Sequence, residues 1–320
     1  MANWLEFQSA HFAAEFDALL ASKREADSDV HDAVAAIIKD VRDRGDVALL
    51  SLTAKFDNFG VANVSDLAVS KVELDAALDG LDKDLRAALE QAAARIHSFH
   101  EKQLPQDFAY KDQVGIELGL RYTPVDAVGL YVPGGKAVYP SSVVMNVVPA
   151  QAAGVKQIAL ASPPQRGEDG RVHPVILAAA KLLGVTEVYA MGGAGAIGAF
   201  AYGAASLGLD PVDVVTGPGN NFVAAAKRAV AGRVGTDSEA GATEILIVAD
   251  DTADPRLVAA DLISQAEHDE QASAVLVTTS MGLADAVQAE IGGLAAQTLH
   301  AARIEVALTG PQSAIVLVDD

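Results

Sequence analysis

The sequence predicts an α/β protein with mainly parallel sheets and a helical N-terminal section. From Val125 onward, short apolar runs rich in β-branched residues alternate with helical segments, a pattern typical of parallel strands covered by helices. Hydrophobic residues make up 51% of the chain and aromatic residues only 5%, so the core must consist mainly of small aliphatic side chains. A length of 320 residues allows two domains, or one domain with an insertion.

Residues 1 to about 103 are expected to be helical, because apolar residues recur at helical spacing in 30–52 and 74–102. Short strands are expected near 67–69 and 115–122. The strands expected after Val125 are 127–132, 157–161, 187–191, 212–216, 244–249, 273–278 and 314–318. The helices expected between them are 143–153, 173–184, 196–207, 219–232, 254–268 and 281–292. A parallel strand is normally followed by a covering helix, so the end at Asp320 predicts part of a longer α/β unit.

Charge and composition exclude several classes of function. The net charge is -20 without a concentrated basic patch, which argues against nucleic-acid binding. The chain has no cysteine, so disulfides, thiolate nucleophiles and zinc sites built from cysteine are excluded. The first 20 residues carry several charged side chains and no apolar run could span a membrane. We therefore expect a soluble, cytoplasmic protein.

Three glycine-rich turns follow expected strands, at 131–135, 192–198 and 217–221. Each could be an ordinary tight turn, and for 131–135 alone that interpretation is favoured. However, open parallel sheets bind ligands at the carboxyl ends of their strands, and a helix N-terminus favours anionic groups. Asn220 could offer its amide to a ribose or carboxamide, or simply cap a helix. Together the three turns favour a nucleotide cleft.

The second turn also carries a literal dinucleotide fingerprint, because Gly193, Gly195 and Gly198 spell G-x-G-x-x-G between a strand and a helix. The acidic residue that binds the ribose should lie about 20 residues later, at the end of the next strand. Asp213 has this spacing, but it stands at the beginning of its strand. The fingerprint is therefore only suggestive.

A possible metal site lies on the helix expected at 254–268. Gln265 and His268 are three residues apart and project from one helical face, with Asp261 on the same stripe. Imidazole and amide oxygen are suitable ligands for a divalent ion. Two ligands do not make a site, and the residues alone favour a polar helix end at which the dipole stabilises His268.

Several segments together resemble the histidinol dehydrogenase family, in the family's order and spacing. They are Gly129–Gly135, Met191–Ala194, Gly217–Asn220, Ala240–Glu244 and Asp261–His268. The resemblance implies oxidation of L-histidinol to L-histidine, the last step of histidine biosynthesis, by two hydride transfers to NAD on a zinc-bound substrate. It also implies a homodimer. Without a thiol, the aldehyde intermediate would be attacked directly by water, and an aldehyde dehydrogenase mechanism through a thiohemiacetal is nearly excluded.

The resemblance assigns roles to individual residues. Tyr131 and Asn220 would contact NAD, and Thr243 would contact the substrate. Gln265 and His268 would bind zinc and also touch the substrate. Gly195 stands where many members have a glutamine that contacts NAD, so this contact is in doubt here and the G-x-G-x-x-G spelling is incidental.

The family carries its catalytic Glu-His pair and two further zinc ligands, an aspartate and a histidine from the partner subunit, in a later segment that these 320 residues do not contain. No catalytic residue is therefore assigned, and we expect the 320-residue chain to be inactive alone. An alternative is a nonenzymatic nucleotide-binding or interaction module.

The resemblance further implies two Rossmann-like lobes. Residues 131–236 would form an inserted NAD-binding lobe. Residues 1–130 would supply the helical section and the beginning of a larger lobe, which 237–320 would continue with the zinc and substrate residues. The polar, glycine-rich loop 232–241 is a candidate connection between lobes.

Overall fold

The structure is a computed structural model that describes residues 3–57, 59–134, 138–238 and 244–319. It confirms the predicted fold class, because helices alternate with strands and the two larger sheets are entirely parallel. The chain divides into two compact units. We call residues 1–31 with 241–320 the first unit and residues 32–240 the second unit. Helix α1 (Phe12–Arg44) contributes residues to both.

The sheet of the second unit has five parallel strands in the order β6-β5-β4-β7-β8. The strands are β4 (Ala127–Tyr131), β5 (Gln157–Ser162), β6 (Glu187–Ala190), β7 (Val214–Thr216) and β8 (Gly235–Thr236). The chain enters this sheet at the central strand β4 and continues through β5 to the edge strand β6. It then crosses to the other side of β4, where β7 and β8 follow. The strand order therefore reverses between β4 and β7, and such a switch point opens a crevice at the carboxyl ends of the strands.

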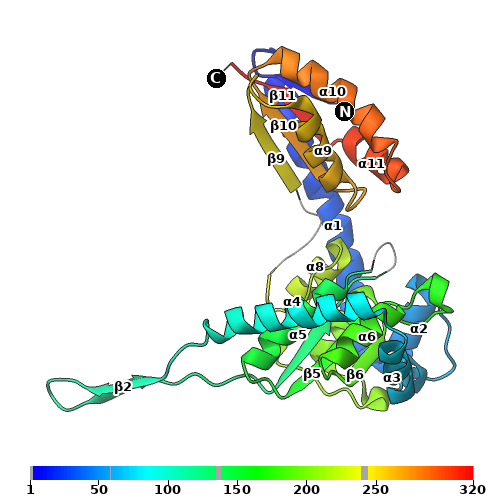
Figure 1. The fold of residues 1–320 in the computed structure, drawn as a ribbon, viewed down its shortest axis with the longest axis vertical. Coiled ribbons are helices and arrows are strands. Elements are labelled where there is room, and N and C mark those ends of the chain that lie inside the picture. The colour runs from blue at the N-terminus through cyan, green and yellow to red at the C-terminus, as the bar shows by residue number, and fades with distance from the viewer. Residues whose placement is uncertain (1–2, 58, 135–137, 239–243, 320) are drawn as a thin grey trace. The chain divides into compact units, whose positions relative to one another are not determined.

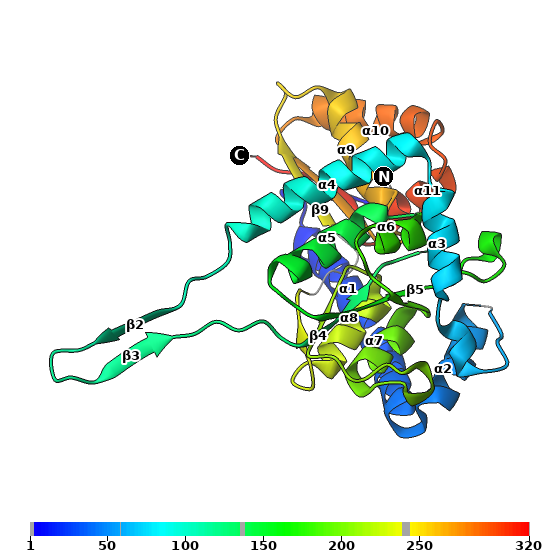
Figure 2. The same cartoon turned by 60° about the horizontal axis from the view of Figure 1, so that its bottom comes forward.

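Helices cover both faces of this sheet (Figure 2). One face carries α5 (Pro140–Ala152) and α6 (Pro174–Leu182), with α3 (Lys71–Asp79) and α4 (Lys83–Glu101) packed outside them. The other face carries α7 (Gly193–Tyr202) and α8 (Asn221–Val230), and α2 (Asp46–Phe56) packs against α7. Short 3₁₀ helices at Val64–Leu67, Arg166–Glu168 and Ala205–Leu207 lie in the connections.

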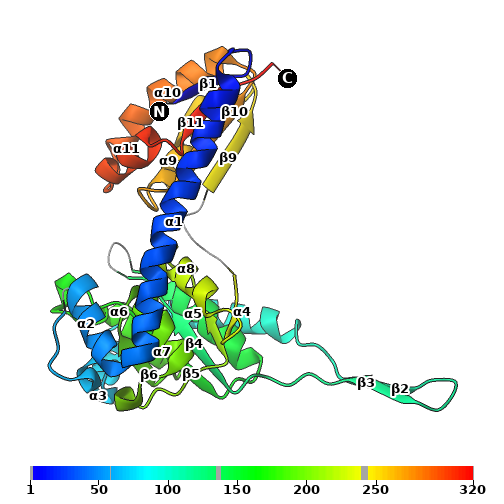
Figure 3. The same cartoon turned by 180° about the vertical axis from the view of Figure 1, so that it is seen from behind.

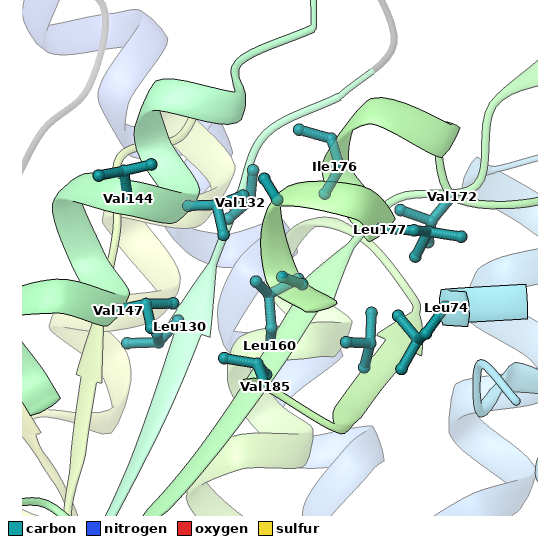
Figure 4. Packing of buried hydrophobic residues seen from close by; sticks show 14 of the residues in the cluster. Leu74, Leu130, Val132, Val144, Val147, Leu160, Val172, Ile176, Leu177 and Val185 are labelled. Carbon is teal, nitrogen blue, oxygen red and sulfur yellow. The ribbon is translucent and has the colours of Figure 1, made fainter. Parts of the chain in front are cut away.

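The core of the second unit lies between the sheet and helices α5 and α6 (Figure 4). Leu130 and Leu160 of the strands are fully buried in the same cluster as Val147 of α5 and Ile176 of α6. Leu74 of α3 belongs to this cluster as well. Burying each of these side chains contributes roughly 1.5–3 kcal/mol, so this packing fixes the strands whose ends form the site.

The single helix expected at 74–102 is two helices, because the sequence between them contains both a stop and a start. Helix α3 ends at Asp79, and Gly80 is its C-cap. Asp82 then caps α4 by accepting hydrogen bonds from the backbone N–H groups of Asp84 and Leu85, both at 3.0 Å. Such a side-chain cap satisfies donors that a new helix leaves open.

The sheet of the first unit has four parallel strands in the order β1-β11-β10-β9. The strands are β1 (Trp4–Glu6), β9 (Glu244–Ala249), β10 (Ser273–Thr278) and β11 (Ala314–Leu317). Helices α9 (Pro255–Ala266), α10 (Met281–Ala295) and α11 (Ala301–Thr309) cover one face (Figure 1). β1 and α11 were not expected from the sequence.

Strands β2 (Phe108–Lys111) and β3 (Glu117–Leu120) of the second unit form an antiparallel β-hairpin. All eight strand residues are exposed, and Figure 3 shows the hairpin extending away from the parallel sheet of its unit. Phe108 pairs with Leu120 and Tyr110 with Leu118, so one face of the hairpin is apolar. A two-stranded hairpin is at best marginally stable in water.

Two sequence-based boundaries differ from the structure. Residues 32–130 pack with the second unit rather than with the first, because Leu74 and Leu89 of the N-terminal helices enter the core of the five-stranded sheet. The segment 67–69 forms the end of a 3₁₀ helix and a single bridge from Ala68 to Tyr189 instead of a strand. Among the described residues, no helix combines the length and apolar character that crossing a membrane requires.

Candidate nucleotide and metal sites

A cavity of about 710 Å³ lies in the second unit at the carboxyl edge of its sheet. Segments that follow β4, β5, β6 and β7 line one side, and residues of α1 and α2 line the other. The lining residues are Ile37, Leu49, Leu52, Thr53, Phe56, Asp57, Tyr131, Gly134, Pro163, Pro164, Gln165, Gly167, Met191, Gly192, Gly193, Ala194, Gly195, Asn220 and Phe222. The three glycine-rich turns of the sequence thus meet at one cavity, which includes the strand-order switch point.

The turn after β7 depends on a glycine at position 217. Gly217 has a φ of +115°, and a Cβ built there would lie 2.1 Å from the carbonyl oxygen of Tyr131. A side chain at 217 would therefore collide with the backbone at the end of β4. This close approach brings the segments of Tyr131 and Asn220 to the same end of the sheet.

A buried lysine holds this turn from within the unit. Lys227 of α8 is 2% exposed, and its Nζ donates hydrogen bonds to the carbonyl oxygens of Gly217 at 3.0 Å and Ser238 at 2.6 Å. It also forms an ion pair with Asp237, whose carboxylate accepts a hydrogen bond from Gly217 N–H at 2.9 Å. Both backbone groups of Gly217 are therefore fixed by the Lys227–Asp237 pair, a feature that no sequence motif indicated.

Asn220 is the N-cap of α8, and its side-chain oxygen accepts a hydrogen bond from Val223 N–H at 3.2 Å. The residue is exposed and lines the cavity. Because the oxygen is used for capping, the amide NH₂ group is the part that can donate to a ligand. The two interpretations of Asn220, cap and ligand contact, are therefore compatible.

Tyr131 stands at the end of β4 with its hydroxyl oxygen directed to the start of α7. It accepts a hydrogen bond from Gly193 N–H at 3.2 Å. Burial raises the pKa of Tyr131 to about 12, so the phenol stays neutral at physiological pH. A neutral hydroxyl that accepts from the protein can still donate its own proton to a ligand.

Asp57 is a cavity residue that the sequence analysis missed. It is the C-cap of α2, and its carboxylate accepts a hydrogen bond from Gly192 N–H. Burial raises the pKa of Asp57 to about 6, and the hydrogen bond from Gly192 partly opposes this shift. No motif surrounds Asp57 in the sequence, because its partners come from a strand end more than 130 positions later.

The residues of the G-x-G-x-x-G spelling serve helix packing as well as the cavity. A Cβ built on Gly198 would lie 3.1 Å from Val41 of α1, and one on Gly195 would lie 3.3 Å from Leu52 of α2. Asp213, which has the spacing of a ribose-binding acid, lies at the opposite edge of the sheet. Its carboxylate accepts hydrogen bonds from the N–H groups of Asp126 and Ala127, both at 2.9 Å, so it fixes the start of β4.

The residues assigned to zinc lie in the first unit. Gln265 is half-buried in the last turn of α9. His268 lies two positions beyond the helix end and is exposed. Its backbone N–H donates a hydrogen bond to the Gln265 carbonyl oxygen at 3.2 Å. Thr243 lies outside the described residues. Across the part of the chain that the structure describes, no group of three or more His, Cys, Asp and Glu residues could hold a metal. Gln265 and His268 have donor types that suit zinc, but they fill half of a tetrahedral site.

Comparisons with known proteins agree on one family. The sequence profile of histidinol dehydrogenase matches residues 20–320. The chain is 58% identical to the histidinol dehydrogenase of Leifsonia xyli over 89% of its own length and 65% of that protein. It is 55% identical to the enzyme of Thermobifida fusca, over 94% and 68%. It thus spans about two thirds of the length of these curated relatives.

A solved structure gives the same result. The crystal structure of histidinol dehydrogenase from Elizabethkingia anophelis matches with a TM-score of 0.76 at 34% identity, covering 90% of this chain and 65% of that one. Sequence and fold similarity therefore extend over nearly the whole chain. The chain belongs to the histidinol dehydrogenase family.

Proposed function

We propose that this chain provides the NAD-binding part, and some of the zinc and substrate contacts, of an enzyme that oxidises L-histidinol to L-histidine with two NAD. The observation that carries the proposal is the cavity at the switch point of the second unit, where Tyr131 and Asn220 both line the wall. Family membership supports histidinol as the substrate and a cytoplasmic biosynthetic role. The cavity residues supply the physical means to hold a dinucleotide.

The cavity suits a dinucleotide in three respects. Its glycine turns let a ligand approach the backbone closely. The N-terminus of α8 lies at the cavity through Asn220 and Phe222, and a helix N-terminus favours an anionic group such as a pyrophosphate. The Asn220 amide offers a neutral donor at the turn after β7, and the Tyr131 hydroxyl offers one at the turn after β6. We therefore assign Tyr131 and Asn220 as NAD contacts.

Gln265 and His268 would hold zinc, with Thr243 contacting the substrate. When bound, zinc would fix and polarise the substrate. In the first unit, the helix end keeps the two donors three positions apart, so that an amide oxygen and an imidazole nitrogen can reach one ion. The general base and the remaining ligands would come from the part of the relatives that this chain does not span.

Self-association belongs to the same proposal. The apolar face of the β2–β3 hairpin consists of Phe108, Tyr110, Leu118 and Leu120, and each is 43% to 56% exposed. An exposed apolar face on an otherwise unsupported hairpin indicates an interface. We propose that a second copy of the chain covers this face, consistent with the homodimer that the family resemblance implies.

Binding and turnover measurements on the 320-residue chain test these assignments separately. We expect calorimetry to detect NAD binding, Tyr131→Phe to weaken it, and NADH formation from histidinol with zinc to remain at background. Robust turnover would contradict the assignment of the base to residues outside this chain. NAD binding without any zinc uptake would instead support a nonenzymatic nucleotide-binding module. Light scattering would detect the dimer, and Tyr110→Ser with Leu118→Ser should abolish it.

A further inference from the structure

Asp57 is an acidic residue that is half-buried in the wall of the cavity. It lines the cavity from the end of α2, across from the turn that follows β6. A Cβ built on Gly192 would lie 2.9 Å from the Asp57 Oδ1 atom, so the glycine at 192 allows the carboxylate to reach the backbone. The sequence thus provides both the carboxylate and the space that admits it.

No described side chain that lines the cavity carries a positive charge that could balance this carboxylate. Among the described residues that line the cavity, Asp57 alone has a side chain that is charged at neutral pH. Burial is the main cause of its raised pKa, and no cation among the described residues contributes to the shift. The Gln165 Nε2 atom in the same wall is buried and has no hydrogen-bond partner among the residues that the structure describes. A half-buried carboxylate without a cation costs folding free energy, and such groups in clefts are typical of functional sites.

Dinucleotide sites on parallel sheets commonly use one acidic residue to bind the ribose hydroxyls of the adenosine. Asp213 has the sequence spacing for this role, but its carboxylate binds the backbone at the opposite edge of the sheet. Asp57 lies beside the end of β6, on the side of the switch point away from β7. A dinucleotide that extends from the Asn220 turn across the sheet would bring its adenosine ribose toward this residue.

We propose that Asp57 determines the choice between NAD and NADP, by accepting hydrogen bonds from the adenosine ribose and repelling a 2′-phosphate. The inference rests on the proposed nucleotide cavity and adds the residue that sets its specificity. A 2′-phosphate would bring about two negative charges next to a carboxylate in a partly desolvated wall, where repulsion is much stronger than in water. The ribose hydroxyls of NAD instead find an acceptor.

A purely structural role for Asp57 makes a different prediction. If the carboxylate only caps the start of α7 through Gly192 N–H, an asparagine oxygen can accept the same hydrogen bond. Asp57→Asn would then change neither cofactor preference nor fold. Under our proposal the same variant keeps the cap but removes the charge, so the preference must change.

The test is calorimetric titration of the 320-residue chain with NAD and with NADP, at one ionic strength. We expect the unaltered chain to bind NAD at least about tenfold more tightly than NADP, and Asp57→Asn to reduce this ratio by about tenfold. Asp79→Asn is the matched control, because Asp79 is exposed at the end of α3 and does not line the cavity. This control should preserve the ratio.

Two results would overturn the inference in distinguishable ways. If Asp57→Asn retains NAD binding with an unchanged NAD-to-NADP ratio, Asp57 does not set specificity, although the nucleotide cavity stands. If the unaltered chain binds neither cofactor, the proposed nucleotide cavity fails and the inference fails with it. Circular dichroism of each variant verifies that the fold is intact, and Asp57→Ser provides a second uncharged side chain that should shift the ratio in the same direction.

Discussion

The two units of this chain differ in how much of a site each contains. In the second unit, four strand ends and residues of helices α1, α2, α7 and α8 line one cavity, and the Lys227–Asp237 pair fixes one of its turns through the backbone of Gly217. In the first unit, Gln265 and His268 stand at one helix end, and the described residues provide no metal-binding group of three or more. A dinucleotide needs mainly one sheet edge, whereas a zinc ion needs donors from several segments. Nucleotide and metal binding should therefore be separable in this chain.

The largest expected effect is on the second unit, through its buried cation. Lys227→Met would leave Asp237 without its partner and the Gly217 carbonyl without its donor. Lys227 donates two hydrogen bonds to carbonyl oxygens, and a hydrogen bond from a charged group contributes about 1.5–3 kcal/mol. We therefore expect a loss of about 3–5 kcal/mol in the free energy of unfolding, with weakened NAD binding. Denaturant titration measures it.

The control for this change is Lys181→Met. Lys181 also forms an ion pair, with Asp75 at 2.6 Å, but Asp75 is about half exposed. Such pairs contribute about 0–1 kcal/mol. If both variants lost the same free energy of unfolding, the Lys227–Asp237 pair would stabilise the fold no more than the exposed Lys181–Asp75 pair does.

The next effect concerns the close approach at the switch point. Gly217→Ala would place a methyl group against the Tyr131 carbonyl oxygen, at a φ that side chains rarely adopt. We expect a loss of about 2–4 kcal/mol and a clear decrease in NAD affinity, measured by thermal unfolding and calorimetry. Gly232→Ala is matched, since Gly232 has a φ of +86° with open space around it. It should lose only about 1 kcal/mol, and similar losses would show that φ alone accounts for the effect.

A third prediction concerns pH. The folded-state pKa of Asp57 is raised to about 6 from a reference of 3.8, so the folded state binds a proton more readily than the unfolded state between these values. The Asp57 carboxylate therefore destabilises the fold above pH 6, and this penalty disappears as pH falls toward 3.8. Asp57→Asn should gain stability over the unaltered chain by on the order of 1–3 kcal/mol at pH 7. Denaturant titrations at pH 4 and pH 7 measure the difference, and a gain equal at both would contradict the raised pKa.

The comparison also explains which features the sequence could predict. Alternating apolar runs located most of the parallel strands and the turns at 131, 192 and 217, because local pattern determines local structure. The packing of the N-terminal helices on the five-stranded sheet was not visible in the sequence, because Leu74 and Leu89 look like any amphipathic helix residues and only their contacts place them in that core. Spacing suggested Asp213 for the ribose, and the fold instead directs it to the start of β4. Asp57 interacts with a residue that is remote in the sequence, and no sequence motif marks the partners of Lys227. No local sequence pattern could therefore identify either residue.

The smallest effect is expected from the first unit, and it tests whether the two sites are separable. His268→Ala should weaken zinc binding to the 320-residue chain by about tenfold, since one of two donors is lost. It should leave NAD affinity unchanged, because His268 does not line the nucleotide cavity of the second unit. His300→Ala is the control, as a histidine of the same unit in a different segment. Parallel titrations with zinc and NAD measure both affinities. If His268→Ala weakened NAD binding as much as zinc binding, nucleotide and metal binding would not be separable in this chain, and the prediction would be wrong.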